Sequence, residues 1–257
     1  MRYALIVGVP VALCAALLGV LLVLRRYAMI GDGLSHVGFG ALSVAYALNL
    51  APMAVAVPVV ILAAFLLLGL SGSRRLRGDS AIAVLSSSAL ALGVVANSLA
   101  GGSATDLSGY LFGSILTLTR ADVVLSVSLS AVVILLFVLF KNRIFAVTFD
   151  EPFAKSAGVR VGLYNGLLAL LIAVTVVVGM RIVGTMLISS LIIFPALGAM
   201  QLAGSFRGVV LLSALISVVS FLLGLLFAMT LPAGATIVLC NLAALLICTV
   251  LGKVVKH

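Results

Sequence analysis

Long apolar runs separated by short polar segments form the main pattern of the chain. A helix that crosses a bilayer needs about 20 apolar residues, and nine runs, divided at charges, Gly and Pro, approach that length. They cover approximately residues 3–24, 28–49, 52–70, 80–100, 122–140, 162–180, 182–202, 208–231 and 235–252. A further run at 107–119 is too short to cross and predicts a re-entrant or interfacial helix. The pattern predicts an all-α integral membrane protein, a polytopic bundle of about 8–9 transmembrane helices plus that short helix.

The composition agrees with a membrane protein. Hydrophobic residues make up 65% of the 257 residues and charged residues 8%, whereas soluble domains carry about 25% charged residues. No polar stretch is long enough for a separate soluble domain or linker, so we expect a single transmembrane domain over 1–257. The first run is longer than a signal-peptide core and is followed by Arg25 and Arg26, which predicts a helix that stays in place.

The net charge of +9 comes from short basic clusters between the apolar runs, a distribution typical of orientation signals rather than of a nucleic-acid surface. With nine crossings and the N-terminus outside, one side receives Arg25, Arg26, Arg74, Arg75, Arg77, Lys141, Arg143, Lys155, Arg160, Arg207, Lys253 and Lys256. The other side receives Arg2, Arg120 and Arg181. The positive-inside rule therefore predicts a multi-pass membrane protein with its N-terminus outside and its C-terminus in the cytoplasm.

One predicted cytoplasmic connection, 141–161, is too long for a simple turn. Its segment FAKSAGV predicts a short helix that ends at Gly158 in a left-handed cap. We expect another protein to dock on this connection.

An acidic side chain lies inside the second apolar run. An aspartate within a transmembrane helix costs about 2.5–3.5 kcal/mol, so Asp32 is a candidate functional residue. His36 lies one turn further along, and the i, i+4 spacing puts both side chains on one face. A carboxylate and an imidazole can bind Zn, Mn or Fe. Two ligands do not hold a metal, but two copies of the chain about a two-fold axis would supply two Asp and two His.

The same two residues also fit roles that involve no metal. Asp32 follows Gly31 near a helix start and is a candidate N-cap, with His36 bonded to a neighbouring helix. A proton relay of the kind found in pumps is the third possibility. The residues alone leave all three roles open.

The segment LRRYAMIGDGLSHV at 24–37 resembles the permease subunits of bacterial ATP-binding-cassette importers for zinc, manganese and iron. Tyr27 stands where that family usually has Met. Further segments are similar to the family in the expected order, and together they cover nearly the whole chain. They are SGYLFGSIL at 108–116, FDEPFAKSAGV at 149–159, MRIVGTMLISSLIIFPALGA at 180–199 and PAGATIVL at 232–239.

The resemblance implies a homodimeric permease in the bacterial plasma (inner) membrane, two cytoplasmic ATP-binding subunits and an extracytoplasmic metal-binding protein. Asp32 and His36 match the family's intramembrane metal site. Asp150, Ala154 and Gly158 match the loop that acts as a coupling helix in the groove of the ATPase. Pro152 stands where many relatives have a second acidic residue.

Three more residues are candidates for gating or for a helix break. Tyr110 and Phe112 belong to the YLFG segment and are candidates for a gate near the outer mouth, with aromatic packing at the interface as the simpler interpretation. Pro195 lies inside an apolar run and predicts a kink that frees backbone carbonyls. Accommodation of that kink by a neighbouring helix is the alternative to a role in the path.

The chain lacks the motifs of an enzyme. It has no G-x-x-x-x-G-K-[ST] loop, so ATP hydrolysis must come from a partner. It has no GxSxG or HExxH motif and its three Cys show no CxxC spacing, so we expect neither catalysis nor a resident cofactor. The only metal expected is the transported ion.

The sequence therefore predicts a permease that opens alternately to either side and moves a divalent transition metal into the cytoplasm. The motif sequences are most similar to those of the zinc-uptake permeases, so zinc is the expected metal, with manganese or iron as alternatives. The runner-up is a proton-coupled secondary transporter or an ion channel that uses Asp32 and His36 without ATP. Such proteins usually carry several intramembrane ionisable groups and internal repeats, and neither is evident here.

Overall fold

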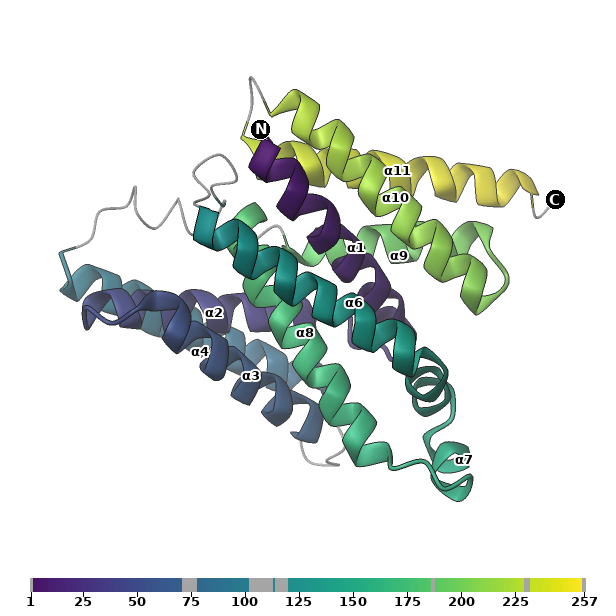
Figure 1. Ribbon diagram of the computed structural model, residues 1–257, viewed down its shortest axis with the longest axis horizontal. Coiled ribbons are helices and arrows are strands. Elements are labelled where there is room, and N and C mark those ends of the chain that lie inside the picture. Colours follow the sequence, from purple (N-terminus) through teal and green to yellow (C-terminus); the bar gives the residue numbers. More distant parts are fainter. Residues whose placement is uncertain are drawn as a thin grey trace.

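The computed structural model describes residues 2–70, 78–101, 113, 120–185, 188–228 and 232–255. Across these ranges the chain forms helices and no strand (Figure 1). The helices are α1 (Arg2–Leu24), α2 (Ile30–Ala47), α3 (Pro52–Leu70), α4 (Gly78–Leu99), α6 (Arg120–Phe149), α7 (Glu151–Ser156), α8 (Val161–Val183), α9 (Ile188–Leu202), α10 (Phe206–Phe227) and α11 (Ala233–Val255).

Helix α1 lies at the centre of the bundle. It packs against α6, α8, α9 and α10, and its apolar side chains cover every face, as expected of a helix enclosed by others. Helices α2, α3 and α4 form a group on one side of it, and α9, α10 and α11 form a group on the other (Figure 1). Helix α8 connects the first group to the centre of the bundle, because it packs against α2 and α3 as well as against α1 and α6.

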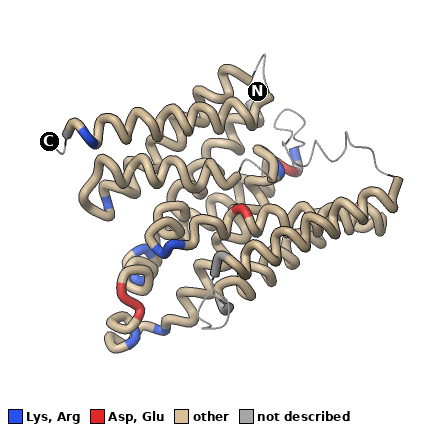
Figure 2. Tube along the Cα trace, turned by 180° about the vertical axis from the view of Figure 1, so that it is seen from behind, with Lys and Arg blue, Asp and Glu red and all other residues tan. Residues whose placement is uncertain are grey.

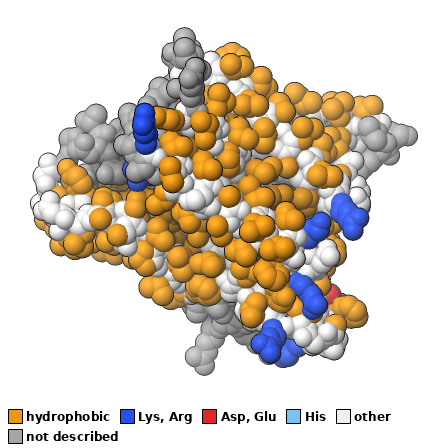
Figure 3. Space-filling view, viewed as in Figure 1, with side chains coloured by type: hydrophobic (Ala, Val, Ile, Leu, Met, Phe, Trp, Pro, Cys, Tyr) orange, Lys and Arg blue, Asp and Glu red, His pale blue; other side chains and the backbone are white. Residues whose placement is uncertain are grey.

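The outer surface is apolar, as a lipid-facing surface must be. Hydrophobic side chains cover most of the face seen in Figure 3, and several Lys and Arg side chains gather at the end near α7. Within the described ranges six helices are long and apolar enough to cross a membrane, namely α1, α4, α6, α8, α10 and α11. Helices α3 and α9 are shorter apolar helices, and α2 carries Asp32 and His36. The protein is thus a multi-pass membrane protein, and nine crossings stay a prediction.

Two helix boundaries differ from the expected ones. Helix α6 continues to Phe149, nine residues past the expected end at 140, because Ile144 and Val147 bury their side chains and keep the segment helical. The expected run 182–202 begins instead with the end of α8, and α9 starts only at Ile188. The break falls at Gly184, whose φ of 99° suits glycine and ends α8. The short helix expected at 107–119 lies outside the described residues, except for Gly113.

Candidate functional site

A tight turn brings α2 directly after α1. Arg26 adopts the left-handed region with φ 61°, a conformation more often taken by glycine at the end of a helix. The Tyr27 N–H donates to the Leu22 carbonyl at 2.9 Å and the Arg26 N–H to the Val23 carbonyl at 3.0 Å. These two bonds cap α1 in a Schellman arrangement, and α2 begins at Ile30.

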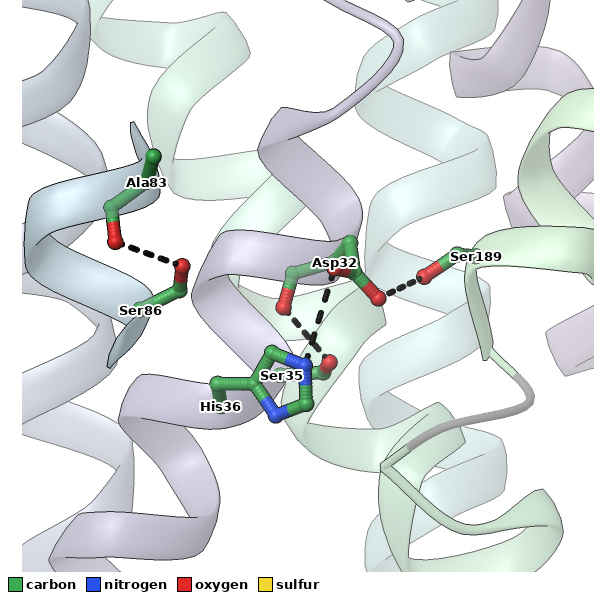
Figure 4. Close-up of polar contacts among 6 residues, drawn as sticks. All are labelled: Asp32, Ser35, His36, Ala83, Ser86 and Ser189. Atoms are coloured by element: carbon green, nitrogen blue, oxygen red, sulfur yellow. Dashed lines mark hydrogen bonds and ion pairs between the residues drawn. The ribbon is translucent and has the colours of Figure 1, made fainter. Parts of the chain in front are cut away.

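Asp32 and His36 lie on one face of α2, as the i, i+4 spacing predicts (Figure 4). The His36 Nε2 atom lies 3.6 Å from Oδ2 of Asp32. The other carboxylate oxygen, Oδ1, accepts a 3.0 Å hydrogen bond from the Ser189 hydroxyl of α9. The Asp32 side chain is 35% exposed and the His36 side chain 15% in the single chain, so the pair opens to one side.

The prediction that Asp32 could be an N-cap is wrong. The residue at the N-cap of α2 is Met29, no side chain caps the helix, and Asp32 lies inside the first turn. Packing by a hydrogen bond from His36 to another helix also finds no support among the described residues, because the buried Nδ1 atom has no partner there. Asp32 and His36 therefore face each other inside the bundle, and the Nδ1 atom of His36 can still form a further bond.

Close packing of glycines holds α2 in place. A Cβ atom at Gly40 would lie 2.5 Å from the backbone oxygen of Ala89, so α4 approaches α2 at the level of the main chain. On another face, a Cβ atom at Gly38 would lie 2.5 Å from Sδ of Met180 in α8. Such close approach is typical of small residues in membrane helices. It allows α2, which carries Asp32 and His36, to be surrounded by α3, α4, α8 and α9.

One chain supplies an incomplete metal site. Within the described ranges no group of three or more His, Cys, Asp or Glu side chains could hold a metal ion. The pair offers one carboxylate and one imidazole, and Ser189 adds a hydroxyl bound to the same carboxylate. A four-coordinate ion needs further ligands from a second molecule, from backbone carbonyls or from water.

The residues expected on the long connection belong to α7 and its caps. Asp150 is the N-cap, and its carboxylate accepts a 2.9 Å hydrogen bond from the Phe153 N–H. Ala154 is buried on the inner side, while Phe153 is exposed. Gly158 has φ 78°, and the Gly158 and Val159 N–H groups bond back to Lys155 and Ala154. The short helix with a left-handed cap at Gly158 is confirmed.

The three candidate gating residues have different outcomes. Tyr110 and Phe112 lie outside the described residues. Pro195 is buried inside α9, which continues through it to Leu202. A role of Pro195 in the ion path stays a prediction.

Sequence reasoning missed several polar contacts between helices, among them those of Ser189 and Arg181. Ser189 was part of an apolar run in which nothing distinguished it from Ser190. Arg181 of α8 forms an ion pair of 2.6 Å with Asp122 of α6. The sequence did contain a signal for this second contact. Arg181 and Asp122 lie at the ends of two expected spans and carry opposite charges.

The fold is that of a multi-pass helical membrane protein. The chain belongs to the ABC 3 transport family, whose sequence profile matches residues 1–252. The manganese import system permease protein ScaB of Streptococcus gordonii is 31% identical over 241 residues, covering 93% of this chain and 86% of ScaB. The manganese transport system membrane protein MntC of Halalkalibacterium halodurans is 29% identical, covering 93% of this chain and 82% of MntC.

A solved structure has the same fold. PsaBC from Streptococcus pneumoniae in complex with Fab matches with a TM-score of 0.85 and 32% sequence identity, covering 96% of this chain and 90% of that chain. The expected family is thereby confirmed. The chain is a permease of a metal ABC importer, a non-catalytic membrane subunit that works with an ATPase and a solute-binding protein. A secondary transporter or channel is not favoured.

Proposed function

We propose that the chain moves Mn²⁺ into the cytoplasm and that Asp32 and His36 bind the ion halfway through the membrane. The observation that carries this proposal is the pairing of the two side chains on α2, with Ser189 bonded to the carboxylate. Carboxylate and hydroxyl oxygens suit manganese, and imidazole tolerates it. Relatives named for manganese import favour this ion over the zinc expected from the motifs.

A second copy of the chain would complete the site. Asp32 is half-open to one side, and two copies about a two-fold axis would supply two carboxylates and two imidazoles. Such a site releases its ion only if binding is weak and brief, as transport requires. Homodimerisation thus explains why one chain holds no complete ligand set in its described residues.

Helix α7 is the proposed docking element for the cytoplasmic ATPase. It is short, capped at both ends and displays the exposed Phe153. Lys and Arg residues cluster at the end of the molecule that carries α7 (Figure 2), and by the positive-inside rule this supports a cytoplasmic location of that end. The N-terminus is then outside, where the metal-binding protein delivers the ion. ATP binding and hydrolysis would open the permease alternately to either side.

Uptake into proteoliposomes that contain the chain and its ATPase tests the proposal. Wild type is compared with Asp32→Asn and His36→Ala, and with His257→Ala as the control, since the chain has two His. Loss of a residue that only orients a metal ligand typically lowers affinity or activity by roughly 10–100-fold. The two site variants change the proposed ligands themselves, so we expect their uptake to fall by more than that. His257→Ala should transport like the wild type.

Two outcomes would contradict the proposal. Full uptake by Asp32→Asn and His36→Ala, with the complex still assembled, would move the ion path elsewhere. Uptake of Zn²⁺ that an excess of Mn²⁺ does not reduce would overturn the proposed cargo and leave the site in place.

A further inference from the structure

Arg25 connects three helices at the end of the molecule that carries α7. It follows the last residue of α1, and its guanidinium donates two hydrogen bonds in different directions. Nε donates to the Thr148 hydroxyl of α6 at 3.1 Å, and Nη1 donates to the Asn165 side-chain oxygen of α8 at 2.8 Å. Thr148 in turn donates to the Ile144 carbonyl at 2.7 Å, which orients its hydroxyl.

The two acceptors flank α7 on both sides. Thr148 stands two residues before Asp150, the cap of α7, and Asn165 lies in the second turn of α8, which follows α7. Burial lowers the pKa of the Arg25 guanidinium, and the negative charge of Glu151 in the first turn of α7 opposes that effect. The side chain is therefore attached to the segments on either side of α7 and attracted by α7 itself.

The backbone of Arg25 leads directly to the candidate metal site. Asp32 follows seven residues later. The segment between them is short and closed by the bonds of Arg26 and Tyr27 to α1 and by the Ile30 N–H bond to the Tyr27 carbonyl at 3.0 Å. A displacement of Arg25 would therefore be passed to the start of α2 rather than absorbed by a loose loop.

We propose that Arg25 is a positioning residue that transmits movement of α7 to α2, and so couples the ATPase to the metal site. The inference rests on the proposed docking of the ATPase at α7. Spatial position alone does not demonstrate coupling, so the test must measure it.

The guanidinium suits this role for a geometric reason. Its donors are held in a rigid planar fork, so it binds two acceptors in two directions at once. The ammonium group of Lys is a single point charge and cannot occupy both positions. Arg25→Lys should therefore keep the charge and lose the connection, whereas Arg26 has an exposed side chain that makes neither bond.

The first measurement is hydrogen exchange in the purified complex of the chain with its ATPase, with and without a non-hydrolysable ATP analogue. In the wild type we expect the analogue to change exchange both at 151–158 and at 27–34. In Arg25→Gln and Arg25→Lys the change should persist at 151–158 and disappear at 27–34. Arg26→Gln, the matched control, should behave as the wild type.

The second measurement is the number of metal ions transported per ATP hydrolysed. We expect this ratio to fall about tenfold in Arg25→Gln, and Thr148→Val combined with Asn165→Ala should reproduce the fall. Adding Arg25→Gln to that pair should change nothing further, because residues of one network act non-additively.

Three results would overturn the inference. They are an unchanged exchange response at 27–34 in Arg25→Gln, no response at 27–34 in the wild type, and a loss of thermal stability in Arg25→Gln with the transport ratio intact. The exchange experiment needs no transported ion. It therefore decides the role of Arg25 even if the proposed cargo or metal site is wrong. The uptake assays of the wild type and of Asp32→Asn and His36→Ala decide the cargo and the site separately.

Discussion

The Ser189 hydroxyl of α9 donates a 3.0 Å hydrogen bond to Oδ1 of Asp32 on α2, across 157 residues of sequence. Because His36 faces the other oxygen, Oδ2, the carboxylate is held from two sides and its orientation is restricted. Helix α2 is thereby tied to a helix of the opposite group. A movement of α9 relative to α2 would change how the carboxylate is presented.

Replacing Ser189 by Ala should weaken metal binding without unfolding the protein. Loss of a side chain that orients a metal ligand typically costs about 10–100-fold in metal affinity, so we expect the apparent KM for Mn²⁺ to rise by about tenfold or more. Ser88→Ala is the control, because Ser88 is exposed on α4 and its hydroxyl donates to the Val84 carbonyl of its own helix. Equal KM values for the two variants would show that Ser189 does not position Asp32.

Replacing Gly40 by Ala should destabilise the packing of α2 on α4. The new Cβ would lie 2.5 Å from the Ala89 oxygen and 3.4 Å from the Ala89 Cα, and a backbone cannot move aside as a side chain can. Overpacking of this kind costs about 1–3 kcal/mol, which should lower the Tm in detergent.

Gly162 provides the matched control for that experiment. It lies in the first turn of α8, and a Cβ there would meet nothing within 4 Å. Gly162→Ala should leave the Tm unchanged or raise it, by up to about 1 kcal/mol of stability. A lower Tm in Gly162→Ala than in Gly40→Ala would contradict the close approach of α2 and α4.

Two substitutions of Asp150 should separate its cap from its charge. Asp150→Ala removes the acceptor of the Phe153 N–H and should cost about 1 kcal/mol, which frays α7. Asp150→Asn keeps an acceptor oxygen and should retain the helix. If α7 docks on the ATPase, the Kd of the complex should rise about fivefold for Asp150→Ala only. The same weakening in both variants would assign the effect to charge instead.

The ion pair between Arg181 and Asp122 should show measurable coupling. The Arg181 side chain is 40% exposed and that of Asp122 is 12% exposed, so solvent screens the pair in part. A double-mutant cycle with Arg181→Gln and Asp122→Asn should give about 0.5–1 kcal/mol of coupling in unfolding experiments. Strict additivity would mean that the contact does not hold α6 to α8.

The Asp32–His36 pair and the short helix α7 could be predicted because both depend on local sequence. Asp32 and His36 share a face through helical spacing alone, and the cap at Gly158 depends on its own neighbours. Ser189 and Arg25 could not be found this way, since their partners lie 157, 123 and 140 residues away. Which serine of an apolar run meets Asp32 depends on how α9 is rotated and shifted against α2.

The sequence by itself determined that this protein is a bundle of membrane helices, where most of those helices lie and which of them carries an acid. These properties follow from bonds between residues four apart and from the length of apolar runs. Only the tertiary structure decided that α6 extends to Phe149, that Asp32 meets a serine of α9 and that Arg25 connects α1 to α6 and α8. Such contacts depend on the shapes of facing helices, where a glycine such as Gly40 sets how closely two backbones approach.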